Sequence, residues 1–306
     1  MLLKSHVPFK VRPMLATLID KPFNKPGWLH EEKYDGYRLI VYKDGDWVML
    51  VSRNDKDRTN TFAEISEAIR KLPAGTLVLD GEAVVFDRKG ISRFQLLQRG
   101  GRNLKFAVFD CLYVDGRDLR KEPLKVRRVA MESAIAGQGK LFPSKRLASN
   151  GLVAFEQAKK RGLEGMVAKE EAGIYVEGRS KKWLKCKVHQ EEEFVIGGYT
   201  APAGQRSHFG ALLLGAYDGA ELRYVGKVGT GFTKSSLASL HAAFRGLVRQ
   251  RAPFVDPPRE RNVTYLEPKL VAQIAFQEWT ADRKLRQPVF LGLRDDKKPT
   301  ECLMPK

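Results

Sequence analysis

Apolar and polar residues alternate between Trp28 and Val51 around two turn signals, Asp35-Gly36 and the segment 43–46. This pattern predicts three strands joined by tight turns as an antiparallel meander. Other short apolar segments predict further strands at 77–86, 106–113, 166–168 and 183–188. Four prolines within residues 1–26 predict an extended arm without a helix.

Apolar residues at helical spacing predict three helices in the same part of the chain. The first spans 61–72, where Thr61 and Glu64 fit a capping box and Pro73 ends the helix. The others span 124–136 and 151–161, and Gly162 closes the last one. Strands and helices therefore alternate irregularly, which is typical of an α+β domain.

A polar joint of three glutamates, 191–193, separates this part from a second one in which glycines punctuate short strands. Strands are predicted at 194–199, 211–217, 222–228 and 270–279, with one helical stretch near 235–250. Short strands at this density predict a small β-barrel of the OB type. We therefore expect an α+β domain of antiparallel sheets with helices over residues 1–188 and an OB-fold barrel over 189–306.

Composition narrows the class of partner. The 306 residues carry a formal net charge of +18, with most of the excess before residue 190, and such a field attracts nucleic acid, ATP or an anionic lipid surface. The three cysteines form no C-x-x-C pair, so we expect no disulfide framework, no thiolate zinc site and a reducing compartment. No apolar run approaches 18 residues, so we expect no signal peptide and no membrane span.

The strongest chemical lead is Lys33-Tyr34-Asp35-Gly36, a lysine just before a turn at a strand end. Alone, this segment also fits a hairpin beside a solvated lysine. Further motifs follow in order: Arg38, then 52–54, 80–83, 106–110, 164–169, 185–187 and 294–297. The set resembles the nucleotidyltransferase motifs of ATP-dependent DNA ligases, which RNA ligases and mRNA capping enzymes share in part. With 13–16, 197–199 and 226–229, it is most similar to the ligase module of bacterial end-joining ligases of the ligase D type.

The resemblance implies that Lys33 is the catalytic nucleophile. Its amine would attack the α-phosphate of ATP, release pyrophosphate and carry AMP as a phosphoramidate. AMP would then pass to a 5′-phosphate, and a 3′-hydroxyl would expel it. An amine is a nucleophile only when deprotonated, so we expect the pKa of Lys33 to be lowered by desolvation or by nearby cations, which Lys185, Lys187 and Arg38 could supply.

The resemblance assigns roles to other residues as well. Phe109 would stack on the adenine, and Glu31 would orient the purine edge. Glu82 would contact the ribose or a metal ion, and Glu164 would help to hold Mg²⁺, with Mn²⁺ as the alternative ion. The nucleotide or DNA phosphates would be bound by Arg38, Arg53, Lys185, Lys187, Arg294 and Lys297. Each feature alone has a structural reading too: two turns, a core phenylalanine and protective lysines on an edge strand.

The expected substrate is nicked or broken double-stranded DNA in the cytoplasm, at the nucleoid. The short segment before Lys33 leaves no room for the separate DNA-binding domain of larger ligases, so we expect help from a Ku-like end-binding protein or a repair polymerase. Two alternatives remain open. One is an RNA ligase or a capping-type nucleotidyltransferase, and the other is a non-catalytic nucleic-acid-binding relative. Separate labelling with ATP and GTP tests the nucleotide preference, and an unlabelled protein that binds duplex would indicate the second alternative.

Overall fold

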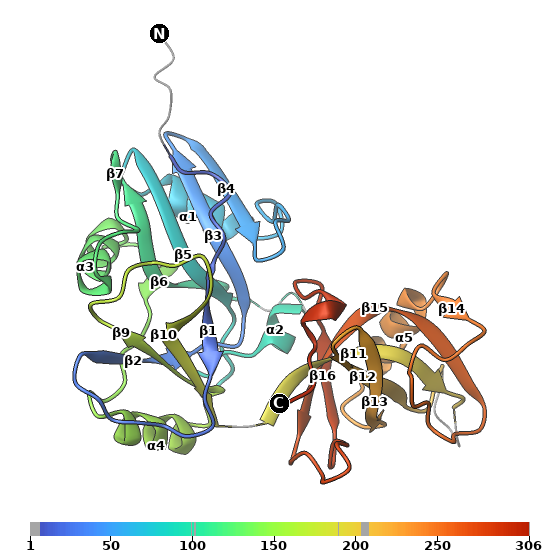
Figure 1. The fold of residues 1–306 in the computed structure, drawn as a ribbon. Helices are drawn as coiled ribbons and strands as arrows, with labels where there is room; N and C mark the ends of the chain where they lie inside the picture. The colour runs from blue at the N-terminus through green and yellow to red at the C-terminus, as the bar shows by residue number, and fades with distance from the viewer. Residues whose placement is uncertain (1–6, 99, 101, 189, 203–207, 306) are drawn as a thin grey trace. The chain divides into compact units, whose positions relative to one another are not determined.

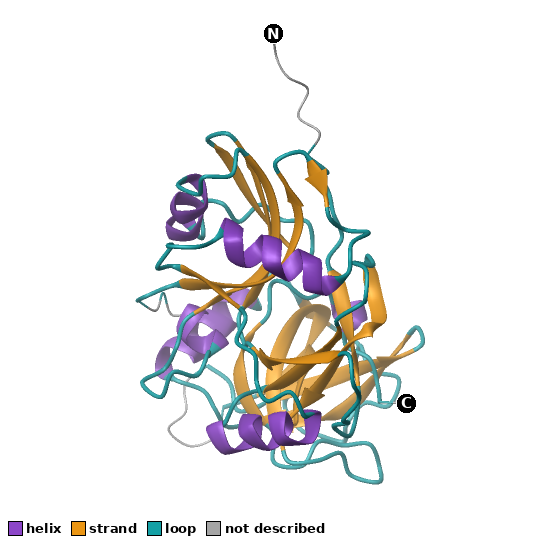
Figure 2. Ribbon diagram, turned by 90° about the vertical axis from the view of Figure 1, so that its left-hand side faces the viewer, coloured by secondary structure: helices purple, strands orange, loops and turns teal. Residues whose placement is uncertain are grey.

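The computed structural model describes residues 7–98, 100, 102–188, 190–202 and 208–305 (Figure 1). The chain divides into two compact units, Met1–Val188 and His189–Lys306. Short helices lie against layers of strands (Figure 2).

The first unit contains a six-stranded sheet in the order β4-β3-β5-β6-β7, with β8 beside β6. The central strands are mostly buried, and apolar side chains fill most of their buried positions. The sheet comprises β3 (Tyr37–Asp44), β4 (Trp47–Ser52), β5 (Thr76–Val84), β6 (Lys105–Val114), β7 (Arg117–Asp118) and β8 (Leu141–Pro143).

A second sheet of the same unit has four strands in the order β1-β10-β9-β2 (Figure 1). Its strands are β1 (Met14–Leu18), β2 (Trp28–Lys33), β9 (Gly165–Glu170) and β10 (Gly178–Lys187). The predicted extended arm is therefore partly wrong. Met14–Leu18 forms a strand that pairs in parallel with β10, and Met14 is fully buried. The sequence did not predict this strand because its partner lies far along the chain.

The predicted three-stranded meander is wrong at its first turn. β3 and β4 form the expected hairpin, but β2 pairs with β9 in the other sheet. The Asp35-Gly36 segment carries the chain between the two sheets. The Asp35 carboxylate accepts a hydrogen bond from Phe94 N at 3.0 Å, and a Cβ on Gly36 would lie 2.3 Å from Ala83 O. This segment is therefore a close-packed crossing rather than a hairpin turn.

Among the described residues of the first unit, three helices lie where the periodicity predicts them: α1 (Ala63–Arg70), α3 (Leu124–Ala134) and α4 (Gly151–Arg161). The short helix α2 (Phe94–Gln98) was not predicted. The predicted capping box at 61–64 is wrong, because the N-cap of α1 is Phe62 and no side chain caps it. α4 ends as predicted at Gly162, which has the left-handed φ of 71°.

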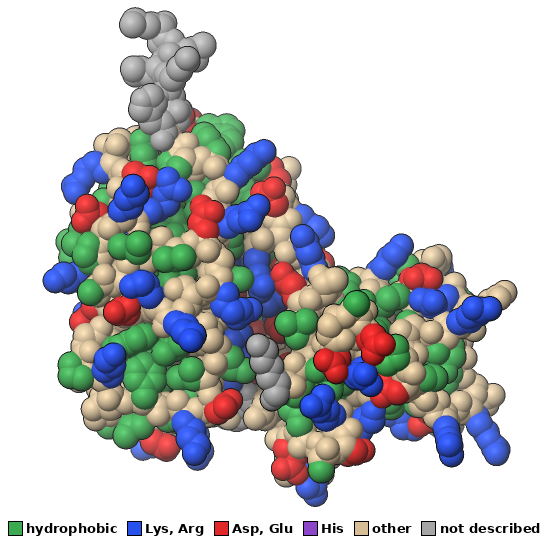
Figure 3. Space-filling view, in the orientation of Figure 1, with side chains coloured by type: hydrophobic (Ala, Val, Ile, Leu, Met, Phe, Trp, Pro, Cys, Tyr) green, Lys and Arg blue, Asp and Glu red, His purple; other side chains and the backbone are tan. Residues whose placement is uncertain are grey.

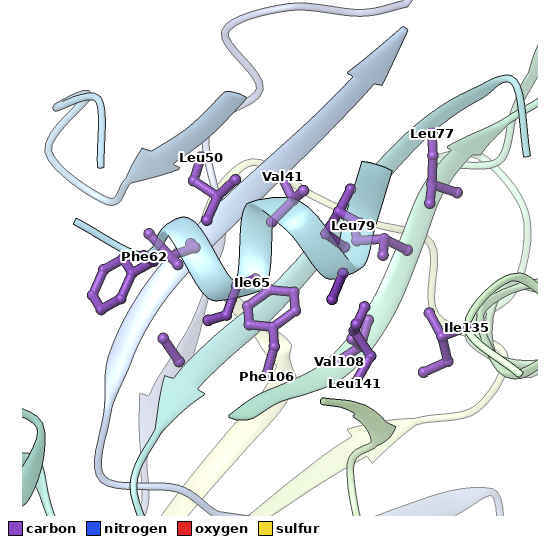
Figure 4. Close-up of a cluster of buried hydrophobic side chains, with 14 of the residues drawn as sticks. Val41, Leu50, Phe62, Ile65, Leu77, Leu79, Phe106, Val108, Ile135 and Leu141 are labelled. Carbon is purple, nitrogen blue, oxygen red and sulfur yellow. The ribbon is translucent and has the colours of Figure 1, made fainter. Parts of the chain in front are cut away.

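Two apolar clusters cover the two faces of the six-stranded sheet. On one face, Phe62 and Ile65 near α1 pack against Val41, Leu79 and Val108 of the sheet (Figure 4). On the other face, a cluster that includes Ile40, Phe109 and Leu112 also contains Met14, Tyr175 and Trp183. This second cluster joins the two sheets of the unit, and it includes Phe109, one of the candidate site residues.

The second unit is built on one six-stranded sheet in the order β13-β12-β11-β15-β14, with β16 beside β15. Register shifts interrupt the pairing of β11 with both of its neighbours, as bends in a curled sheet require. The predicted helix near 235–250 ends early, since Val248–Arg249 forms a strand. The elements are β11 (Gln190–Thr200), β12 (Leu212–Asp218), β13 (Glu221–Val228), α5 (Lys234–Ala243), β14 (Val248–Arg249), β15 (Val263–Phe276), β16 (Val289–Leu293) and η1 (Pro299–Glu301).

Candidate active site

Strand register places the predicted lysines on one face of the four-stranded sheet. Lys33 and Lys187 are both paired with Gly165, so the three residues form one row across β2, β9 and β10. Glu31 and Lys185 are both paired with Val167 in the next row. Because side chains two residues apart on a strand share a face, all these side chains project to the same side of the sheet.

Lys33 forms an ion pair with Glu164, the residue just before β9, with Nζ 2.6 Å from Oε2. The side chains are 20% and 9% exposed, respectively. Gly165 allows the start of β9 to lie close against β10, because a Cβ there would lie 2.2 Å from Cys186 O. The turn therefore presents Glu164 directly to the amine.

The pKa of Lys33 is shifted in the direction opposite to the one expected from the sequence. Burial alone would lower it, but the carboxylates of Glu164, Glu82 and Asp35 together raise it above its usual value. Burial opposes the ionisation of Glu164, yet Lys33, Lys187 and Lys185 hold its pKa below the usual range. The prediction failed because the nearby carboxylates outweigh the effect of burial.

The six-stranded sheet contributes Arg38 from β3 and Glu82 from β5, which are paired residues in neighbouring strands. Arg38 donates through Nε and Nη2 to both oxygens of the buried Asp80, at 2.5 and 2.6 Å. The Tyr175 hydroxyl also donates to Asp80, at 2.7 Å, and accepts from Met14 N at 2.9 Å. Arg38 is thus held in a fixed position, with the N-terminal strand as part of the support.

Phe109 is a core residue that lies beside the same cations. The Arg38 guanidinium lies 4.4 Å from its ring centroid, and the Lys169 ammonium lies 4.7 Å from it. The ring of Trp183 meets it edge to face at 5.9 Å. Phe109 is 8% exposed, so protein groups surround the aromatic ring to which the resemblance assigns adenine stacking.

Glu31 is buried and held by groups that had no predicted role. Arg128 of α3 binds Oε1, while the Ser144 hydroxyl donates to Oε2 at 2.6 Å and Lys169 Nζ lies 2.7 Å from Oε2. One signal for Arg128 existed in the sequence. It occupies an inward position of the α3 periodicity, between Leu124 and Met131, where an arginine needs a buried partner.

The remaining predicted residues are dispersed. Arg53 follows β4 and is half-buried. Arg294 and Lys297 belong to the second unit, after β16. There Arg294 donates to both oxygens of Asp296, at 2.7 and 2.8 Å, and Lys297 lies 3.4 Å from Glu193. The first unit alone therefore brings together Lys33, Arg38, Glu82, Glu164, Lys185 and Lys187 in half-buried positions.

The chemistry of this set suits a nucleotide with a divalent cation. Two carboxylates, Glu164 and Glu82, act on the same amine, and hard oxygen ligands of this kind fit Mg²⁺. Lysines flank them in both rows, as phosphate binding requires. Lys and Arg side chains are also spread among acidic ones over the visible surface of both units (Figure 3).

Within the described residues, no helix is long and apolar enough to span a membrane.

Comparisons with known proteins agree with this geometry. Residues 13–187 match the family model of the ATP dependent DNA ligase domain, and 205–297 match that of the ATP dependent DNA ligase C terminal region. The chain is 37% identical over 97% of its length to the multifunctional non-homologous end joining protein LigD of Pseudomonas aeruginosa. It is 34% identical over 95% of its length to a DNA ligase of Thermococcus fumicolans, of which it covers 57%.

A solved structure gives the same result. The mycobacterial DNA ligase D complexed with ATP and MES is 35% identical, with a TM-score of 0.73 over 96% of this chain and 98% of that one. The chain covers only 37% of the Pseudomonas relative's length and 40% of that of the LigD of Mycolicibacterium smegmatis. These matches confirm both the resemblance inferred from the motifs and the predicted fold class, an α+β domain followed by an OB fold. The chain therefore belongs to the ATP-dependent DNA ligase family.

Proposed function

We propose that this chain seals breaks in DNA through a lysyl-AMP intermediate on Lys33. The amine of Lys33 loses a proton and attacks the α-phosphorus of ATP. A nitrogen–phosphorus bond forms, the bond to the bridging oxygen breaks, and pyrophosphate leaves. AMP then passes to the 5′-phosphate of a break, and attack by the 3′-hydroxyl forms the phosphodiester and releases AMP.

The observation that supports this proposal most strongly is the Lys33–Glu164 pair in the same row as Lys187. A partly buried lysine between carboxylates and further lysines can meet both a polyphosphate and its counter-ion. Glu164 and Glu82 would hold Mg²⁺ or Mn²⁺, which would neutralise phosphate charge. Neutralisation of these carboxylates would also remove the groups that keep the pKa of Lys33 high.

The other candidate residues complete the proposal. Lys185 and Lys187 bind the phosphates, and Arg38 and Arg53 bind phosphate or ribose. Glu31 orients the purine edge, and Phe109 supplies the stacking surface. We assign nucleotide transfer to residues 1–188 and an assisting role to the OB unit, 189–306, through Arg294 and Lys297.

The test is ligation of a nicked duplex that carries a labelled 5′-phosphate, with ATP and Mg²⁺. The wild-type chain should convert the nicked strand to a longer product, and Lys33→Ala should give none while still binding duplex. A protein that binds the duplex but never seals it or acquires AMP would instead support the non-catalytic alternative. A strong preference for an RNA strand at the nick would favour the RNA ligase alternative.

We also propose a role in end joining, because the names of the LigD relatives include it, and a location at the nucleoid, where the DNA substrate would lie. The chain covers less than half of their length, so we propose that a Ku-like end-binding protein or a repair polymerase assists it. Addition of such a protein should raise the rate of end joining but not the rate of lysine labelling. Equal joining with and without the added protein would contradict this part of the proposal.

A further inference from the structure

The buried carboxylate of Glu31 receives donors from three separate segments. Arg128 of α3 binds Oε1, whereas Ser144, after β8, and Lys169 of β9 bind Oε2. The side chains of Arg128, Glu31 and Lys169 are 4%, 2% and 2% exposed. The carboxylate therefore cannot turn without breaking several buried, charge-assisted hydrogen bonds.

These donors leave the Glu31 carboxylate with little capacity to accept further hydrogen bonds. An ionised carboxylate has about four acceptor sites, and three are occupied by these donors. The remaining acceptor position is on Oε1, which accepts a hydrogen bond from Arg128 alone among these donors. Glu31 also shares its face of the sheet with its cross-strand neighbour Val167, which is half-buried next to the row of Lys33.

We propose that Arg128, Ser144 and Lys169 are positioning residues that orient Glu31 to select adenine over guanine. The inference rests on the proposed function and deepens it. A fixed carboxylate oxygen accepts a hydrogen bond from the exocyclic amino group of adenine. At the equivalent position guanine presents a carbonyl oxygen, which the same carboxylate oxygen repels. A site that leaves a buried polar group unpaired rejects the wrong ligand strongly.

The placement of Arg128 argues for this role over a purely stabilising one. Its guanidinium extends from Glu31 to Glu132, which lies 3.0 Å from Nη2 and is 42% exposed. Its Nε is buried without a hydrogen-bond partner among the residues that the structure describes. A buried N–H without a partner costs stability, so this arginine is a poor choice for stability alone. Its Nη1 binds Glu31 while its Nη2 also donates to Ser144 O at 3.3 Å, so one rigid guanidinium links the carboxylate to the segment that supplies the Ser144 hydroxyl.

The test compares self-adenylation and self-guanylation of Lys33 with α-labelled ATP and GTP at several concentrations. Arg128→Lys keeps the charge but loses the guanidinium that links Glu31 to Ser144 O, and Ser144→Ala removes one hydrogen bond to Glu31. The matched control is Glu132→Gln, which changes the outer end of the same guanidinium. The measured quantity is the ratio of kcat/KM for ATP to that for GTP, because general damage to the fold lowers both values equally.

We expect Arg128→Lys to lower this ratio about tenfold, mainly through a higher KM for ATP, and Ser144→Ala to lower it about threefold. Glu132→Gln should leave it within about twofold of wild type. An unchanged ratio in folded Arg128→Lys and Ser144→Ala would overturn the inference, as would an equal loss with both nucleotides. If Arg128→Lys does not fold, Ser144→Ala decides. No labelling of the wild type with either nucleotide would refute the ligase proposal, and this inference with it.

Discussion

Substitution of Gly165 by alanine tests whether the close approach of β9 to β10 positions the reactive pair. The added Cβ would lie 2.2 Å from Cys186 O and 2.8 Å from the Cα of Lys187. Both are backbone atoms, so no side-chain rotation relieves the contact. Ordinary contact begins near 3.4 Å, so the two strands must separate by about 1 Å.

This separation has two measurable consequences. The strain of an overfilled, well-packed position is about 1–3 kcal/mol of unfolding free energy. The same shift moves Glu164, the residue before Gly165, away from its 2.6 Å contact with Lys33. A displacement of about 1 Å in a catalytic arrangement costs about 100-fold in rate. We therefore expect a modest loss of stability and a large loss of lysine labelling.

The assay is the single-turnover rate of labelling by α-labelled ATP, with the melting temperature measured by circular dichroism. The control is Gly139→Ala, because a Cβ at Gly139 meets nothing within 4 Å. Gly139→Ala should behave like wild type in both measurements. If Gly165→Ala labels at the wild-type rate, the strand contact does not position the reactive pair, and the reasoning is refuted.

Two further predictions concern stability. Burial lowers the pKa of His30 below its usual 6.5, so the unfolded chain binds more protons and stability falls as the pH drops below about 6.5. Between pH 7.5 and 5.5, the wild type should lose up to about 1.4 kcal/mol more than His30→Gln in urea denaturation, and equal losses would contradict this. Asp80→Asn removes the buried carboxylate to which Arg38 donates two hydrogen bonds, and it should lower the free energy of unfolding by about 3 kcal/mol. Asp118→Asn breaks an exposed ion pair with Arg120 and should lower it by less than about 1 kcal/mol. Similar losses in these two variants would show that the Arg38 pair is not a buried support.

The types of most elements could be predicted from the sequence, but the sheet to which each strand belongs could not. Alternation of apolar and polar residues identifies a strand without naming its partner, so β2 was assigned to its neighbour β3. β1 was missed because its partner β10 begins only at Gly178, far along the chain from Met14. The capping box at 61–64 failed because a matching motif does not require its hydrogen bonds to form.

The same limit applies to the candidate site: sequence spacing shows which residues of one strand share a face, but only the fold shows which strands are neighbours. The two-residue spacing of Lys185 and Lys187 fixes their common face, and the register adds Lys33 to it. Arg128 was missed because its partner Glu31 lies 97 residues away along the chain. The pKa of Lys33 was assigned the wrong direction because only the fold shows that Glu164 lies 2.6 Å from the amine, with Glu82 and Asp35 also acting on it.

The most direct test of the account is incubation of the purified chain with α-labelled ATP and Mg²⁺, followed by peptide mapping and a chase with nicked duplex. The account predicts one AMP per chain on Lys33, none in Lys33→Ala, and transfer of the label to the 5′-phosphate during the chase. A chain that acquires no label, or acquires it on a residue other than Lys33, would contradict the central claim.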